Sequence, residues 1–274
     1  SPIAFTQLSL LGDDKIIPND SRKAYRIELT EVKDYNGDGA VDLTDVEYML
    51  RFGDNPPKRL DGNGDFRSEE CLELLKEADV VVTNPPFSLF REYVAKLIGY
   101  DKKFIIIGNK NAITYKEVFP LIKEGKIWLG YRNINSDMWF YVPEDYEYEK
   151  IINGRKIKHI MGCWFTNIDV PKRHEMLTLY KKYTPEEYPK YDNYDAIEVS
   201  KVAEIPCDYV FSENCNGIMG VPITFLDKYN PDQFEIIGLD RYTVPSQFLV
   251  GGRVAINGKP RYARILIRRR KDED

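Results

Sequence analysis

The strongest constraint on the fold is a short apolar run that ends at two consecutive prolines. Residues Asp79 to Thr83 read DVVVT, which is typical of a buried strand in a parallel sheet. Asn84 follows, and Pro85-Pro86 then stop the strand because proline cannot donate a backbone hydrogen bond to a neighbour. Residues Leu89 to Ile98 place apolar side chains at helical spacing. The segment therefore predicts a strand, a rigid turn and a helix.

The alternation of strand and helix patterns continues along the chain. Residues Phe104 to Gly108 (FIIIG) predict a second buried strand, and Trp139 to Val142 predict another. This order predicts an α/β domain with a mostly parallel sheet over residues 1–170. Short strands dominate the rest, including a hairpin signal at Asn257-Gly258, so we expect a smaller β-rich region at 171–274.

Asn84, Pro85, Pro86 and Phe87 form a pattern that suits chemistry on an aromatic amine. The amine is a poor nucleophile because its lone pair is delocalised into the ring. The side-chain oxygen of Asn84 and the carbonyl of Pro85 can accept hydrogen bonds from the two N–H groups of the amine. These bonds localise the lone pair of the nitrogen toward an incoming methyl group. The prolines hold this geometry rigid. Phe87 offers an aromatic face to a base taken out of a duplex.

At these residues the sequence resembles the EcoRI-type adenine-specific DNA methyltransferases, from about Gly64 to the C-terminus. The likeness is carried by GDFRS, EADVVVTNPPFSLFREYV, FIIIGNKNAI, CWFTNI and GVPITFL. It implies a Rossmann-like core, S-adenosylmethionine as cofactor, and transfer of methyl to N6 of adenine in double-stranded DNA. It further implies Asp65-Phe66, on the strand before the catalytic one, and Asn84 as cofactor contacts. A target-recognition role for residues 171–274, a cytoplasmic location and a cognate restriction endonuclease also follow.

Other functions fit the same motif. A methyltransferase acting on an RNA base or on a protein glutamine shares it, and a calcium-dependent interaction module on a degenerate scaffold is the non-enzymatic alternative. No strand-loop-helix unit for the methionine and ribose of the cofactor is recognisable before the motif. We therefore expect the chain to lack the beginning of the enzyme.

Residues 34–45 match the spacing of a calcium-binding loop. Oxygen-bearing side chains occupy positions 1, 3, 5 and 9, and a glycine occupies position 6. An Asx-rich turn without an ion is the competing interpretation. The predicted ligands are Asp34, Asn36, Asp38, Ala40, Asp42 and Asp45.

Charge and composition set further limits. The net charge of −5 is the wrong sign for coating nucleic acid, but residues 253–271 hold eight Lys and Arg and no acid. This cluster predicts a local DNA-backbone contact, and a solvated strand face is the competing interpretation. Four widely spaced cysteines without a CxxC pair argue against zinc or a disulfide framework. No apolar stretch is long enough for a membrane span. The three tryptophans are assigned to the core. The predicted DNA contacts are Lys110, Asn111, Arg264, Arg268 and Arg269, with an ordinary polar loop as the alternative for Lys110 and Asn111.

Overall fold

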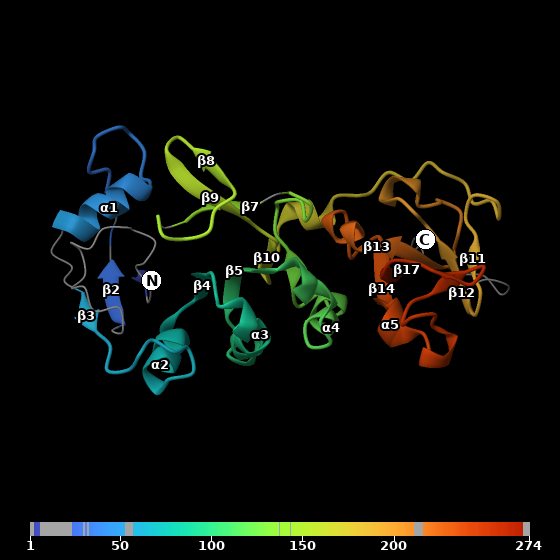
Figure 1. Cartoon of the computed structure of the whole chain (residues 1–274), viewed down its shortest axis with the longest axis horizontal. Coiled ribbons are helices and arrows are strands. Elements are labelled where there is room, and N and C mark those ends of the chain that lie inside the picture. Colours follow the sequence, from blue (N-terminus) through green and yellow to red (C-terminus); the bar gives the residue numbers. More distant parts are fainter. Residues whose placement is uncertain are drawn as a thin grey trace. The chain divides into compact units, whose positions relative to one another are not determined.

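The computed structural model describes residues 3–5, 24–29, 31, 33–52, 57–136, 138–142, 144–210 and 216–270 (Figure 1). The chain divides into two compact units. Unit 1 comprises residues 1–81 and 96–102, and unit 2 comprises residues 82–95 and 103–274. Among the described residues, no helix is long and apolar enough to cross a bilayer.

Unit 1 is built on a small antiparallel sheet of order β1-β2-β3, with β1 at Ile3–Phe5, β2 at Tyr25–Leu29 and β3 at Lys58–Arg59. Helix α1 (Leu43–Phe52) contributes Met49 to a core with Ile27 and Leu29. Helix α2 (Glu69–Glu77) begins after Ser68, whose hydroxyl accepts a hydrogen bond from the backbone N–H of Cys71 at 3.3 Å. This is the N-cap that a serine before Glu69-Glu70 predicts.

The predicted strands around the proline motif lie in a four-stranded sheet of order β4-β5-β10-β6. Strand β5 (Lys103–Asn109) is buried along most of its length, as predicted, and pairs antiparallel with β10 (Gly162–Thr166). Strand β10 also pairs antiparallel with β6 (Trp128–Leu129), and α4 (Phe119–Lys123) precedes β6. Strand β4 (Val80–Thr83) is an edge strand, and α3 (Phe90–Gly99) follows it.

A three-stranded antiparallel sheet of order β7-β9-β8 adjoins β10 in the same unit. Strand β7 spans Met138–Tyr141, β8 spans Lys150–Ile152 and β9 spans Arg155–Ile160. A single residue, Met161, separates β9 from β10. Figure 1 shows β8 and β9 reaching away from β10.

The C-terminal part of unit 2 contains a five-stranded sheet of order β11-β12-β13-β17-β14. Its central strands, β13 (Ile218–Pro222) and β17 (Arg264–Arg269), pair antiparallel and bury Met219 and Leu266 completely. The hairpin predicted at Asn257-Gly258 is confirmed between β15 (Ala255–Ile256) and β16 (Lys259–Pro260), with φ of 51° and 71° at the two turn residues. Both values are positive, as a type I′ turn requires. The remaining elements are β11 (Lys190–Tyr191), β12 (Tyr194–Glu198), β14 (Phe234–Leu239) and α5 (Asp240–Thr243).

The architecture agrees with the expectation only at the level of mixed α and β structure. A mostly parallel sheet is not confirmed, because β12 with β13 is the one parallel strand pair whose register is described. Strand β4 was predicted to be buried, yet Val80 and Val82 are 45% and 68% exposed. Val80 and Val82 share one face of β4 because side chains alternate along a strand, and the apolar sequence does not reveal that this face is uncovered. The functional boundary at residue 170 stays a prediction.

Candidate active site

The Asn84-Pro85-Pro86-Phe87 turn leaves β4 and enters a short 3₁₀ segment, Phe87–Leu89, that runs directly into α3. Pro86 has φ of −56°, near the value that the proline ring imposes. Its carbonyl accepts a hydrogen bond from the backbone N–H of Leu89 at 2.9 Å. Ring geometry and this bond together fix the backbone of the motif.

The start of α3 is anchored by Phe90, whose side chain is 1% exposed. Its ring centroid lies 4.9 Å from that of Phe165 on β10, in a tilted arrangement. A Cβ atom at Gly108 on β5 would approach the Phe90 ring to 2.4 Å, so only glycine fits there. Phe90, three residues after Phe87, is thus held against β5 and β10.

The four motif residues differ in exposure. Asn84 and Pro86 are exposed, Pro85 is buried and Phe87 is half-buried. This places the Asn84 side chain within reach of a substrate while Pro85 anchors the turn.

Lys110 and Asn111 follow β5, the strand next to β4 in the sheet order. The side chain of Asn109 accepts a hydrogen bond from the backbone N–H of Asn111 at 2.9 Å and caps the segment Lys110–Thr114. The backbone N–H of Lys110 donates to the carbonyl of Met161 at 3.0 Å. Lys110 is half-buried and Asn111 is exposed, so both side chains have solvent access for the predicted DNA contact.

Asp65 and Phe66 lie in a turn before α2, which corrects the expectation that they occupy a strand. Arg67 binds both oxygens of the Asp65 carboxylate, at 2.9 Å and 2.6 Å, and lowers the pKa of that group to about 2. An ionised carboxylate has about four acceptor positions, so capacity remains for a further donor. Arg67 also lies over the Phe66 ring, 5.6 Å from its centroid. A charged acceptor beside an aromatic ring fits the chemistry of an adenosine group.

The basic cluster of residues 253–271 is largely engaged inside unit 2. Arg264 is 9% exposed and its guanidinium group binds the carboxylate of Glu198. Arg268 pairs with Glu235 at 2.8 Å, and Arg269 donates to the carbonyl of Cys207 at 2.6 Å. The predicted DNA contact of Arg264 is not supported by this placement, since sequence cannot show which basic residue has a buried acid opposite it. Lys271 lies outside the described residues.

The 34–45 loop folds as a network of Asx turns. Both Asp34 oxygens accept backbone N–H groups, from Gly37 at 2.6 Å and from Gly39 at 2.8 Å. Asp45 is fully buried and accepts the backbone N–H groups of Tyr35 and Asp42. Within the described part of the chain, no group of three or more His, Cys, Asp or Glu side chains is arranged to hold a metal. The loop shows the hydrogen bonds of an Asx-rich turn, and calcium binding stays a prediction.

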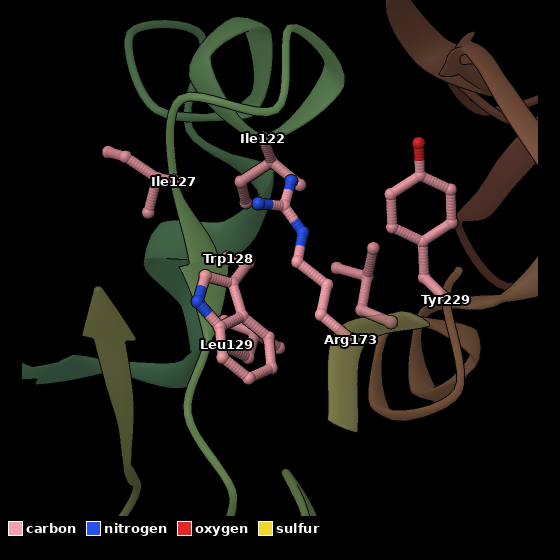
Figure 2. A pocket seen from close by; sticks show the side chains of 7 residues that line it. Ile122, Ile127, Trp128, Leu129, Arg173 and Tyr229 are labelled. Carbon is pink, nitrogen blue, oxygen red and sulfur yellow. The ribbon is translucent and has the colours of Figure 1, made fainter. Parts of the chain in front are cut away.

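A small apolar pocket lies away from the motif and is crossed by an arginine side chain (Figure 2). Figure 2 shows Arg173 passing between Trp128 and Tyr229 with its guanidinium end near Ile122. Arg173 donates to the carbonyl of Gly125 at 3.2 Å and lies 3.5 Å from Asp169. These contacts make Arg173 part of the packing rather than a ligand group.

Two features were missed by the sequence interpretation. Arg67, the partner of Asp65, stands two residues from it, and the short spacing of opposite charges was the available signal. Trp139 was assigned to the core but is half-buried, with the Lys150 ammonium 4.2 Å from its ring centroid. The available signal for the exposure of Trp139 was the alternation of side chains between the two faces of β7 and β9.

Comparison with known proteins gives consistent matches. Residues 2–270 match the model of the family described as adenine-specific methyltransferase EcoRI. The chain is 54% identical over 230 residues to the type II methyltransferase M.EcoRI of Escherichia coli, covering 81% of this chain and 67% of that protein. It is 40% identical over 235 residues to the type II methyltransferase M.MgeORF184P of Mycoplasma genitalium (78% and 71%), and 38% over 247 residues to M.MpnI of Mycoplasma pneumoniae (82% and 75%). No solved structure matches.

The family match over nearly the whole chain and the rigid Asn84 turn together define a methyltransferase that acts on adenine. More specifically, the chain belongs to the EcoRI family of adenine-specific methyltransferases.

Proposed function

We propose that the protein transfers a methyl group from S-adenosylmethionine to N6 of adenine in duplex DNA, as the modification enzyme of a restriction–modification pair. Three relatives named as type II methyltransferases support this assignment. The observation that carries it is the Asn84 side chain, exposed at the end of β4 on a turn fixed by Pro85 and Pro86. The cognate endonuclease and a cytoplasmic location stay predictions.

In the proposed reaction, the side-chain oxygen of Asn84 and the backbone carbonyl of Pro85 accept hydrogen bonds from the two N–H groups of the adenine amine. These bonds localise the nitrogen lone pair before transfer. Phe87, half-buried beside Asn84, stacks on the extruded base and keeps the amine at the two acceptors. S-adenosylmethionine would supply an electrophilic methyl group when it is bound, and the amine nitrogen would then release one proton to solvent.

The same proposal assigns cofactor binding to Asp65 and Phe66, together with Asn84. The Asp65 carboxylate, whose pKa Arg67 lowers to about 2, is ionised and can accept a hydrogen bond from the cofactor. Lys110 and Asn111 contact the DNA, with Arg268 and Arg269 as contacts in the C-terminal sheet. Target recognition by residues 171–274 is part of this proposal.

The test is transfer of labelled methyl from S-adenosylmethionine to three acceptors in parallel: unmethylated duplex DNA, RNA and a protein extract. Label in duplex DNA, recovered as N6-methyladenine after enzymatic digestion, supports the proposal. Label in RNA or in protein glutamine, with none in DNA, overturns it in favour of another planar amine. Absence of transfer to all three acceptors contradicts an enzymatic role.

A further inference from the structure

The sheet β7-β9-β8 has two faces of different chemistry, because side chains alternate along each strand. Cross-strand pairing aligns Tyr141 with Ile157 and Ile157 with Lys150. Trp139 lies two residues before Tyr141, and Arg155 lies two residues before Ile157. Trp139 and Arg155 therefore lie on the same face of the sheet as Tyr141, Ile157 and Lys150. We call Trp139, Tyr141, Lys150 and Arg155 the Trp139 face.

The Trp139 face holds its cations over aromatic rings. The ammonium of Lys150 lies 4.2 Å from the Trp139 ring centroid, and the guanidinium of Arg155 lies 5.4 Å from that of Tyr141. Tyr141 is 60% exposed, and Lys150 and Arg155 are exposed as well. The rings support the two cations without neutralising their charge.

No acidic residue occurs in β7, β8 or β9. In the part of the chain that the structure describes, neither Lys150 nor Arg155 forms a salt bridge with a carboxylate. The face therefore presents two positive charges on an apolar, aromatic base.

The opposite face of the same sheet provides an internal comparison. Lys156 and Lys158 point there, and each is paired with an acid: Lys156 with Glu144 at 3.0 Å and Lys158 with Glu147 at 2.6 Å. The pairing with Glu147 raises the pKa of Lys158. We call this pair the Lys156 face. Its cations already have counter-charges, whereas those of the Trp139 face have none among the described residues.

We propose that the Trp139 face binds the phosphate backbone of duplex DNA through Lys150 and Arg155. A polyanion is the partner that supplies the missing negative charge, and replacing condensed counterions on DNA makes such contacts favourable. This inference rests on the proposed function, which makes duplex DNA the substrate. It adds a contact surface on β7–β9, separate from the motif turn and from the C-terminal arginines.

The experiment compares two double variants of the whole protein, Lys150→Gln/Arg155→Gln and the matched control Lys156→Gln/Lys158→Gln. Equilibrium binding to duplex DNA is measured over a series of salt concentrations. Loss of the Trp139-face cations should weaken binding about fivefold for each cation near physiological salt, equally for any DNA sequence. The slope of the logarithm of the binding constant against the logarithm of the salt concentration should decrease in magnitude by about 2. The control should bind like wild type, and Lys150→Arg/Arg155→Lys should restore the wild-type slope.

The outcomes separate this inference from the proposed function. Unchanged affinity and salt slope in Lys150→Gln/Arg155→Gln, while wild type methylates DNA, overturn the contact surface alone. An equal loss in the Lys156-face control overturns it too, because the effect then follows total charge. If wild type neither binds nor methylates DNA, the proposed function fails together with the inference.

Discussion

Arg264 on β17 and Glu198 on β12 form a buried ion pair in the C-terminal sheet, with side chains 10% and 2% exposed. The Arg264 Nε donates to both carboxylate oxygens of Glu198, at 2.9 Å and 3.1 Å. The Tyr191 hydroxyl donates to the same carboxylate, and the backbone N–H of Arg264 donates to Asp240 at 3.0 Å. Burial raises the pKa of Asp240. The pair links the two halves of the sheet through one polar network.

Removing one partner of this pair should unfold the C-terminal sheet rather than weaken DNA binding selectively. Arg264→Gln leaves the Glu198 charge buried and uncompensated, and should lower the free energy of unfolding by about 3–5 kcal/mol. The control Arg268→Gln breaks a partly exposed pair with Glu235 and should cost no more than about 1 kcal/mol. Urea titrations of both variants measure the difference. Wild-type stability in Arg264→Gln, combined with weaker DNA binding, would restore Arg264 as a DNA contact.

The Asn84 side chain should matter for chemistry and not for folding, because it is exposed. Asn84→Ala should lower the rate of methylation at least about a hundredfold, the scale for removing a preorganised polar group at a reacting centre. Its melting temperature should equal that of wild type. The matched control is Asn135→Ala, an exposed asparagine in a turn of the same unit, which should keep full activity. Methylation by Asn84→Ala at the control rate would exclude the proposed mechanism.

Phe87 should act through its ring. Phe87→Ala should weaken catalysis by roughly 1–3 kcal/mol, the range for stacking of a base on an aromatic side chain, whereas Phe87→Tyr should be tolerated. Single-turnover kinetics with duplex DNA give the comparison, and thermal melting checks the fold. Phe248→Ala removes an exposed ring elsewhere in unit 2 and should have no effect on rate. A Phe87→Ala protein that does not fold would assign Phe87 to packing instead.

Calorimetry can distinguish calcium binding at the Asp34–Asp45 loop from an ion-free network of Asx turns. If calcium binds, titration calorimetry of the chelator-treated protein gives one site, which Asp38→Ala removes and Asp145→Ala, a substitution elsewhere, retains. Because the Asp34 and Asp45 carboxylates already accept backbone N–H groups, we expect affinity no tighter than the roughly 10⁻⁴–10⁻³ M of weak extracellular modules. An absence of binding heat would leave the Asx-turn interpretation.

His174 should make stability depend on pH. Hydrogen bonds to Asp232 and Asp169, at 2.6 Å and 3.0 Å, raise the pKa of His174 above its ordinary value of 6.5. The charged imidazole is therefore favoured in the folded state, so its contribution is fully present below pH 6.5 and is lost as pH rises through the raised pKa. The melting temperatures of wild type and His174→Gln should differ at acidic pH and converge at alkaline pH. A difference that is constant across this range would contradict the linkage.

Local sequence was sufficient wherever a few neighbouring residues determine the backbone. Asn257-Gly258 predicted a type I′ hairpin because few other residues adopt two successive positive φ angles, and Ser68 predicted the start of α2 because its hydroxyl satisfies a free N–H. The apolar run at Phe104 to Gly108 likewise predicted β5. The Asn84-Pro85-Pro86-Phe87 turn and its family resemblance followed from the same kind of short-range information.

Only the tertiary structure decided which groups meet across the sheets. The strand pattern did not show that β5 and β10 run antiparallel, nor that β4 is an edge strand with exposed valines. In sequence, Arg264 and Lys150 both look like ordinary exposed cations. Long-range pairing buries Arg264 against Glu198, 66 residues away, and leaves Lys150 over Trp139 with no acid in its strands. The sequence determines which residues carry a charge. The counter-charge and the solvent exposure of each residue depend on strands that only folding brings together.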